Sequence, residues 1–291
     1  MASSRNTVRR TRTAAMIGGT AAALVMGSLA PAAASTSYRE KPPAPNAARD
    51  HAMGASIRAH ESGATAAQPH TDGLHTGFLK VTQTPGLDVS HYQGAINWGT
   101  VASHGAKFVY IKATEGTGYR DPQFTANYSG SYNAGLIRGA YHYGRPDVSS
   151  GAAQADYFVS HGGGWSADGK TLPGALDIEY GAAGQGGTCY AKSQRGMASW
   201  IKSFSDEYHA RTSRWPVIYT SASWWSQCVG TTGDFSSTSP LWVARYSSNV
   251  GALPYNWGFH TIWQYADAGT FPGDQDRFNG AYSQLQAIAR G

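Results

Sequence analysis

Residues 175–180 carry two carboxylates at a spacing that suits acid–base chemistry. They read Ala-Leu-Asp-Ile-Glu-Tyr after a Leu-Pro-Gly turn signal, so they predict a short strand. Successive side chains of a strand alternate between its faces, which puts Asp177 and Glu179 on the same side. Two adjacent carboxylates do not both ionise cheaply, so one of them can deliver a proton. The pair suits cleavage of a glycosidic bond, although a solvated strand end is the plainer interpretation.

Three other predicted strands also end in acidic or aromatic residues. The notable side chains at these ends are Asp88, Tyr141, His142, Tyr143, Trp263, Tyr265, Asp274 and Asp276. In parallel sheets and barrels, the residues at the carboxyl ends of the strands line the site. Aromatic rings stack on sugar rings, and carboxylates transfer protons. This combination predicts a carbohydrate-binding cleft.

Strand and helix signals alternate from residue 86 onward. Strands are predicted at 86–90, 107–114, 136–143, 175–179, 217–220, 241–245 and 261–265. Helices are predicted at 97–104, 121–134, 149–161 and 190–211. The apolar residues of the last helix, from Met197 to Tyr208, fall on one face. Such alternation predicts a mostly parallel sheet, either open or closed into a barrel.

Five motifs follow one another in a set order along the same stretch. They read G-L-D-V-S-H-Y-Q-G-x-I-N-W, A-Y-H-Y, L-D-I-E, W-Q-Y and D-Q-D-x-F. Each is weak alone, but the ordered set resembles glycoside hydrolase family 25, the Chalaropsis-type lysozymes or N,O-diacetylmuramidases. The resemblance covers residues 86–291. It implies an α/β fold, an irregular TIM-like β/α barrel with fewer helices than a full eightfold barrel.

The resemblance also implies an activity and a set of roles. The activity is hydrolysis of the β-1,4 bond between N-acetylmuramic acid and N-acetylglucosamine in peptidoglycan, without metal or cofactor. Glu179 matches the general acid, and Asp177 matches a residue that stabilises charge or orients the 2-acetamido group. The remaining matches are Asp88 as the first-strand acid, Tyr141 as the cleft tyrosine, and Asp276 as the C-terminal acid, with Asp274 close enough to hold that place instead.

Other functions stay open at this point. A chitinase-like enzyme also uses a strand-end D-x-E, but residues 172–179 lack the upstream acids of its D-x-x-D-x-D-x-E pattern. An inactive cell-wall-binding module would keep the cleft without turnover. His91 and His142 stand beside acids, but their spacing is not that of metal ligands, so hydrogen-bonded histidines are the better interpretation.

The first 85 residues have a different composition from the rest. Residues 1–34 contain four arginines, an apolar run at 14–30 and Ala-Ala-Ala before Ser35, which predicts a secretory signal peptide cleaved after Ala34. Residues 35–85 contain no Trp and one Tyr, so we expect a disordered pro-segment or linker. Residues 86–291 then form the catalytic domain. The protein is expected to be secreted. The pair Arg9-Arg10 leaves open whether the Sec route or the twin-arginine route exports it.

Charge and cysteines complete the expectations. Beyond residue 34 there are 19 basic and 18 acidic residues, and residues 86–291 hold 14 of each, so nucleic-acid binding has no support. No further apolar run is long enough to span a bilayer. Two cysteines in an exported chain, Cys189 and Cys228, predict a structural disulfide. The expected partner is peptidoglycan, and the expected state is a monomer.

Overall fold

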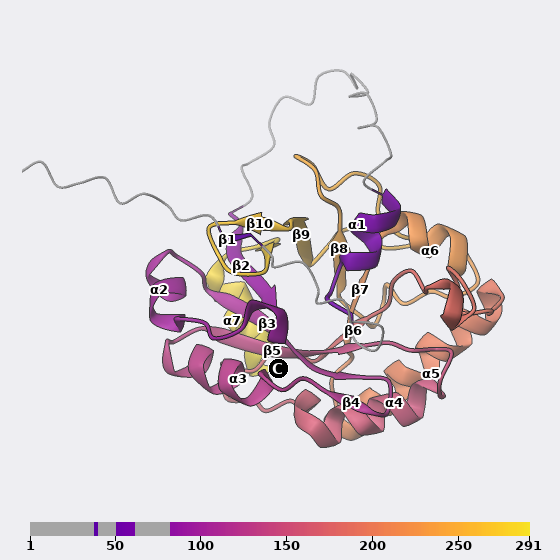
Figure 1. Cartoon of the computed structure of the whole chain (residues 1–291), viewed down its shortest axis with the longest axis horizontal. Coiled ribbons are helices and arrows are strands. Elements are labelled where there is room, and N and C mark those ends of the chain that lie inside the picture. Colours follow the sequence, from indigo (N-terminus) through magenta and orange to yellow (C-terminus); the bar gives the residue numbers. More distant parts are fainter. Residues whose placement is uncertain (1–37, 40–50, 62–81) are drawn as a thin grey trace, which may run out of the picture. The chain divides into compact units, whose positions relative to one another are not determined.

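Eight strands close into a barrel in the computed structural model, which describes residues 38–39, 51–61 and 82–291 (Figure 1). In order around the barrel they are β2 (Thr84–Val89), β3 (Phe108–Glu115), β5 (Ile137–Tyr143), β6 (Ala175–Asp177), β7 (Val217–Thr220), β8 (Leu241–Ala244), β9 (Ile262–Ala266) and β11 (Asp274–Phe278). Two short pairings lie outside the ring. β4 (Tyr119–Arg120) extends β3, and β1 (Tyr38–Arg39) pairs with β10 (Ala268–Gly269).

The strand directions decide where the side chains gather. From β2 through β9 each neighbouring pair is parallel, whereas β11 runs antiparallel to both β9 and β2. In the β2–β11 pairing, Asp274 lies opposite Asp88. The start of β11 therefore lies at the end of the barrel where the parallel strands finish. We call this end the barrel mouth.

Helices connect the first half of the barrel and become scarce in the second. They are α1 (Ala55–Glu61), α2 (Trp98–Ser103), α3 (Phe124–Asn133), α4 (Gly151–Phe158), α5 (Gln194–Thr212), α6 (Ala222–Cys228) and α7 (Tyr282–Arg290). Short one-turn helices occupy His91–Gln93, Val159–Gly163 and Ala183–Gln185. No helix of the described chain joins β8 to β9. The predicted barrel with fewer than eight helices is confirmed.

Side-chain caps explain why several helices begin where they do. Asn97, Ser150, Ser193 and Ser221 each accept a hydrogen bond from a backbone N–H in the first turn of α2, α4, α5 and α6. The predicted start of α5 at Tyr190 is too early, because Tyr190 has a φ of 54°. α5 therefore begins after its cap, and its predicted apolar face from Met197 to Tyr208 is buried.

Two further boundaries differ from the prediction. The helix expected from residue 121 begins at Phe124, because the Asp121 carboxylate accepts hydrogen bonds from the backbone N–H groups of Gln123 and His91. The strand at 175–179 ends at Asp177, so Glu179 lies two residues beyond β6. In both cases the acid at the boundary, Asp121 or Glu179, accepts hydrogen bonds from another segment of the chain.

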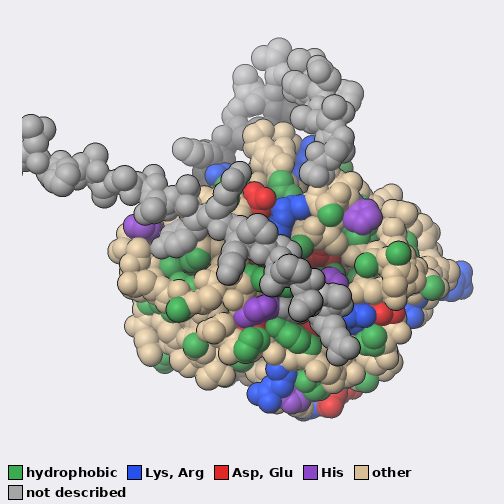
Figure 2. Space-filling model, in the orientation of Figure 1, with side chains coloured by type: hydrophobic (Ala, Val, Ile, Leu, Met, Phe, Trp, Pro, Cys, Tyr) green, Lys and Arg blue, Asp and Glu red, His purple; other side chains and the backbone are tan. Residues whose placement is uncertain are grey.

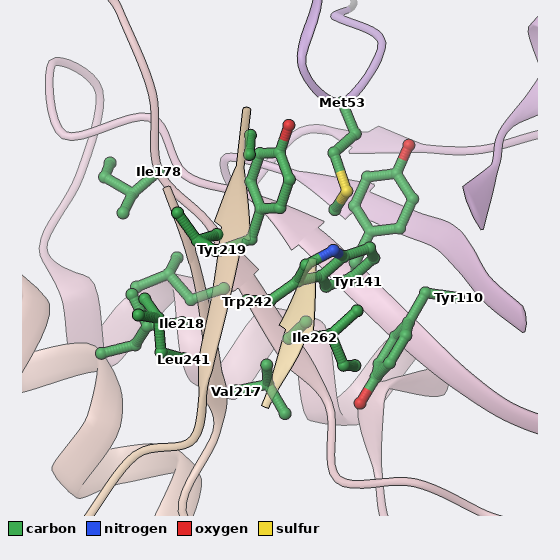
Figure 3. Close-up of a cluster of buried hydrophobic side chains, with 14 of the residues drawn as sticks. Met53, Tyr110, Tyr141, Ile178, Val217, Ile218, Tyr219, Leu241, Trp242 and Ile262 are labelled. Atoms are coloured by element: carbon green, nitrogen blue, oxygen red, sulfur yellow. The ribbon is translucent and has the colours of Figure 1, made fainter. Parts of the chain in front are cut away.

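Large aromatic side chains fill the barrel (Figure 3). The rings of Tyr110 and Trp242 lie 4.8 Å apart, and the Tyr219 ring meets Trp242 edge-on at 5.1 Å. Leu87, Val89, Val109 and Ile111 belong to a second cluster on the outer face of β2 and β3, under α2. Even-numbered residues of β2, and of β3 up to Lys112, therefore face inward. A β-bulge between Lys112 and Thr114 then exchanges the two faces, so that Thr114 contacts His142 on the outer face and Glu115 lies opposite Tyr143. This alternation fixes the inward face of each neighbouring strand.

The predicted disulfide is confirmed between Cys189 and Cys228, whose Cα atoms lie 5.3 Å apart. It joins the loop before α5 to the end of α6. The predicted signal peptide lies outside the described residues. Of the helices that the structure describes, none has the length and apolar character needed to cross a membrane.

Candidate active site

Four acids meet at the barrel mouth. Asp88 is the last but one residue of β2, Asp177 ends β6, Glu179 follows two residues later, and Asp274 begins β11. All four side chains are buried. Burial of this much negative charge is costly unless the groups are hydrogen-bonded, neutralised or protonated. The partners of each acid therefore show how the site is built.

Asp177 is the most isolated of the four. Within the described chain, neither of its carboxyl oxygens has a hydrogen-bond partner of ordinary geometry. The strand register places it between Tyr143 on β5 and Tyr219 on β7. Burial raises the pKa of Asp177 well above its usual range, and the nearby charge of Glu179 raises it further. The expected proximity of Asp177 and Glu179 is present.

Asp88 and Asp274 are held together by an amide. The Gln264 side-chain nitrogen on β9 donates to Asp88 Oδ2 at 2.7 Å and to Asp274 Oδ2 at 3.0 Å. The Gln264 Oε1 accepts from the hydroxyls of Tyr219, at 2.7 Å, and Tyr246, at 2.5 Å. Every polar atom of the amide is used. Our sequence interpretation missed Gln264, although it is the central residue of the W-Q-Y motif.

Asp276 lies deeper in the barrel than Asp274. It pairs with Gly86 near the start of β2, whereas Asp274 pairs with Asp88 near its end. Its Oδ1 accepts a hydrogen bond from Trp242 Nε1 at 3.1 Å. Burial, followed by the charge of Asp274, raises the pKa of Asp276 well above its usual range. Of the two aspartates, Asp274 is the one that borders a small cavity together with Asp88 and Tyr141.

The structure brings two of the predicted cleft aromatics to the acids. Tyr141 lines the small cavity, and Tyr143 lies beside Asp177 in the β5–β6 register. Both rings face inward from β5. The Tyr143 hydroxyl has no hydrogen-bond partner among the described residues. These two tyrosines form one wall of the barrel mouth.

The structure does not bring His142, Trp263 or Tyr265 to the acids. His142 faces outward, between the rings of Phe158 and Phe204, and burial lowers its pKa to about 4. Trp263 and Tyr265 lie on the face of β9 opposite Gln264, where the Arg277 guanidinium stands over both rings. The expected grouping of these three residues with the acids is therefore wrong. Neighbouring residues of a strand face opposite sides of the sheet, so the members of one motif separate.

A buried ion pair stands at the end of β3. Lys112 Nζ lies 2.9 Å from Glu115 Oε2, and both side chains are buried. Arg145 Nη1 also reaches Glu115, at 3.2 Å. Although burial raises the pKa of Glu115, the charge of Lys112 and the hydrogen bond and charge of His51 lower it far more, so this group stays ionised. Our sequence interpretation missed this pair as well.

The partners of Glu179 come from an unexpected part of the chain. Its Oε1 accepts from the backbone N–H of Gly54 at 2.7 Å, and its Oε2 accepts from those of Ser56 and Ile57 at 3.0 and 3.1 Å. The Ser56 hydroxyl donates to the same Oε2. We expected disorder over residues 35–85, yet residues 51–61 are folded into the barrel mouth.

Acidic and basic side chains are scattered over the visible part of the described surface (Figure 2). No set of three or more His, Cys, Asp or Glu side chains in the described ranges is arranged to hold a metal ion. The side chains gathered at the mouth are carboxylates, tyrosines, an amide and the Lys112–Glu115 ion pair.

A β/α barrel with buried carboxylates at its carboxyl mouth is the architecture of a glycoside hydrolase, an enzyme that cleaves bonds between sugars. The chain belongs to the glycosyl hydrolases family 25, whose family match covers residues 87–274.

Two relatives and one solved structure illustrate the similarity. The chain is 44% identical to Lysozyme M1 of Streptomyces globisporus over 279 residues, which is 94% of this chain and 93% of that protein. It is 48% identical to the N,O-diacetylmuramidase of Chalaropsis sp over 210 residues, 71% of this chain and 99% of that protein. The structure of the muramidase from Trichobolus zukalii aligns with a TM-score of 0.69 and 50% identity, over 72% of this chain and 99% of that one.

Proposed function

We propose that this enzyme is a secreted lysozyme that hydrolyses the β-1,4 bond between N-acetylmuramic acid and N-acetylglucosamine in bacterial peptidoglycan. The observation that carries the proposal is the acid pair Asp177 and Glu179 at the mouth of a family 25 barrel. The names of its relatives, lysozyme and N,O-diacetylmuramidase, support the choice of substrate. Peptidoglycan is thus the proposed partner.

Glu179 is the proposed general acid. It gives its proton to the oxygen between the two sugars as the bond from that oxygen to the anomeric carbon breaks. Asp177 is the proposed orienting group for the 2-acetamido substituent of the same sugar. This role is supported by its two oxygens, neither of which has a hydrogen bond of ordinary geometry to a described residue.

The orientation of the acetamido group determines whether its oxygen can form a bond to the anomeric carbon. The acetamido carbonyl oxygen attacks the anomeric carbon as the leaving group departs, and a cyclic oxazolinium intermediate forms. Water then attacks that carbon and loses a proton to the ionised Glu179, which restores the acid. This substrate-assisted course needs a carboxylate oxygen that accepts a hydrogen bond from the acetamido N–H, and it needs no enzyme nucleophile.

The remaining acids are proposed to bind the sugar. Asp88 and Asp274, linked by Gln264, present carboxylate oxygens beside the cavity next to Tyr141. We therefore propose Asp274, rather than Asp276, as the C-terminal acid of the site. Asp276 supports the inside of the barrel through Trp242.

Secretion and domain limits are part of the proposal. A signal peptide at 1–34, a pro-segment at 35–85 and a catalytic domain at 86–291 are supported by the composition and by the disulfide. We propose that the catalytic domain acts as a monomer.

The test is the hydrolysis of purified cell walls by wild type and Glu179→Gln. Turbidity loss is followed, the fragments are reduced with borohydride, and the new ends are identified by mass spectrometry. Each protein is assayed before and after cleavage between residues 61 and 82, because residues 51–61 contact Glu179. We expect muramic acid ends from wild type and a rate lower by about 10²–10⁴ in the variant, the usual contribution of a general acid.

Other outcomes would separate the alternatives. Glucosamine at the new ends would replace the proposal by a chitinase-like activity. Binding to walls by both proteins, with no lysis by cleaved wild type, would indicate a binding module. Circular dichroism of the variant checks that any lost activity is not lost folding.

A further inference from the structure

Residues 51–61 lie in the barrel mouth although they precede the family 25 match by more than 25 positions. The segment consists of a turn followed by α1, which stands beside the ends of β6, β7 and β8 (Figure 1). We call it the mouth segment. It is connected to the barrel through residues 62–81.

The mouth segment occupies both oxygens of Glu179. Three backbone N–H groups and one hydroxyl point at this single carboxylate. A general acid must present an oxygen with its proton to the bond between two sugars. In this arrangement each oxygen of Glu179 is an acceptor for the mouth segment, and Gly54 lies where a substrate would have to approach.

Two cationic or titratable residues of the segment reach other acids of the site. Arg58 Nη1 lies 2.9 Å from Asp274 Oδ2, and its guanidinium stands 5.5 Å from the centre of the Tyr246 ring. His51 Nδ1 lies 2.7 Å from Glu115 Oε1, and its backbone N–H donates to the other oxygen. The segment thus places positive charge against a negatively charged mouth.

Apolar and aromatic contacts fix the segment over its whole length. Met53 is 2% exposed and Ile57 is fully buried, and Met53 points toward Tyr141 and Trp242 (Figure 3). The rings of His51 and His60 lie parallel to those of Tyr143 and Tyr180, with centres 4.6 and 4.2 Å apart. A sugar also binds by stacking one face of its ring on an aromatic side chain.

The far end of the segment is anchored by Glu61. Its carboxylate accepts hydrogen bonds from the hydroxyls of Tyr180 at 3.0 Å and Ser221 at 2.5 Å. The contacts of the mouth segment therefore reach from Glu115 on β3 to Ser221 after β7. A glycan strand entering this mouth would need the same carboxylates and the same ring faces.

We infer that residues 51–61 are an intramolecular inhibitor, which blocks the active site until the connection to the barrel is cut and the segment leaves. This inference rests on the proposed lysozyme activity. It accounts for a segment that lies outside the family 25 match and yet packs Met53 and Ile57 against the inside of the barrel mouth. It also places a regulated step between folding and hydrolysis.

The experiment uses the whole chain with a site-specific protease sequence placed within residues 62–81. Wall lysis is measured before and after the cut, and after the fragment is removed by gel filtration. We expect at least a tenfold rise in rate. A synthetic peptide of residues 50–62, added in excess, should return the rate to that of the uncut protein.

The matched control is the same peptide with Gly54→Val and Arg58→Glu. Gly54 has a φ of 73°, and a Cβ there would overlap the hydroxyl oxygens of Tyr246 and Tyr219. The second change repels Asp274. This peptide should not inhibit, and the same two changes in the uncut chain should raise its lysis rate. Ala59→Ser, at an exposed position of α1, should leave the uncut chain inhibited.

A binding assay separates this inference from the proposed function. Fluorescence anisotropy of a labelled peptide of residues 50–62 reports its binding to the cut protein without any hydrolysis, and soluble peptidoglycan fragments should displace it. Absence of binding, or equal lysis rates before and after the cut, would overturn the inhibitor. Specific peptide binding with no muramic acid ends from any form would instead count against the lysozyme activity.

Discussion

At the scale of single residues, the buried aspartates carry a stability cost that depends on pH. The pKa of Asp276 is raised by burial and by Asp274, so its folded-state value lies above the ordinary 3.8. Folding stability from such a group is complete below about 3.8 and is lost as the pH rises toward the folded-state pKa. The protein therefore becomes less stable over this range for each buried acid of this kind.

Replacing Asp276 by Asn should reveal this cost. The amide oxygen can still accept the hydrogen bond from Trp242, but the side chain no longer titrates. We expect the melting temperature of Asp276→Asn, relative to wild type, to rise as the pH is raised above 3.8 and to level off above the folded-state pKa of Asp276. Differential scanning calorimetry at several pH values measures the slope, which a constant packing defect would not change.

Asp168 provides a control of opposite sign. Burial is the largest single influence on Asp168 and raises its pKa, but hydrogen bonds from the Lys170 backbone and Thr171, together with the charge of Arg138, outweigh it in sum and lower the pKa. Its contribution to stability is present above 3.8 and is lost as the pH falls through the folded-state pKa. Asp168→Asn should therefore lose melting temperature relative to wild type as the pH rises from the folded-state pKa toward 3.8, and the difference should stay level at higher pH. Parallel slopes for the two variants would contradict the assignment.

At the scale of elements, the sequence predicted strands better than it predicted which side chains meet. Seven of the barrel strands were expected within a few residues of their bounds, because their apolar runs are long or flanked by turns. β11 was not, since its inward side chains are Asp274 and Asp276 and the stretch reads as a polar loop. A hydrophobic pattern cannot identify a strand whose buried face is acidic.

The same limit applies to the site. Asp88, Asp177, Glu179 and Tyr141 could be placed at the mouth because each ends a predicted parallel strand. The alternation of β5 and β9 was also available from the sequence and would have separated His142 from Tyr143. The contacts of Gln264 with Asp88 and of Gly54 with Glu179 were not available, because each joins groups more than a hundred positions apart.

The loop between β6 and α5 depends on its disulfide. The bridge closes a loop over a separation of 39 residues and ties this loop to α6. In the chain-entropy estimate, such a loop contributes about 4 kcal/mol. Replacing both cysteines by Ala should lower the melting temperature by roughly 8–16 °C, from about 2–4 °C for each kcal/mol in a domain of this size. Thermal denaturation with and without reductant measures it.

Reductant is the internal control for that prediction. It should lower the melting temperature of wild type toward that of the double variant and leave the double variant unchanged. We chose Ala because Cys228 is fully buried, and Ser would bury a hydroxyl. A double variant as stable as oxidised wild type would show that the bridge contributes nothing.

At the scale of the whole molecule, barrel closure depends on one glycine. Gly273 precedes β11 with a φ of 72°, and a Cβ there would overlap the backbone carbonyl oxygen of Asp88 on β2. Gly273→Ala should destabilise the fold by about 2 kcal/mol or more, because both strain and a backbone clash act at the closing pair of strands. Urea denaturation followed by tryptophan fluorescence measures the change.

Gly164 offers a matched comparison in the same molecule. A Cβ there meets no other atom within 4 Å, and its φ is −63°. Gly164→Ala should leave stability within about 0.5 kcal/mol of wild type, as expected for an unstrained surface site. Similar losses in both variants would show that the closing pair has no special sensitivity.

The pairing of β2 with β11 also sets an order of events during biosynthesis. Asp88 is synthesised early, whereas Asp274, its partner in the β2–β11 pairing, lies near the end of the chain. A ribosome therefore releases most of the protein before the two edges can join, and long-range pairing of this kind forms slowly. The growing chain exposes an open sheet edge throughout that interval, and such an edge can pair with other chains. Completion of β11 closes the barrel and removes this edge.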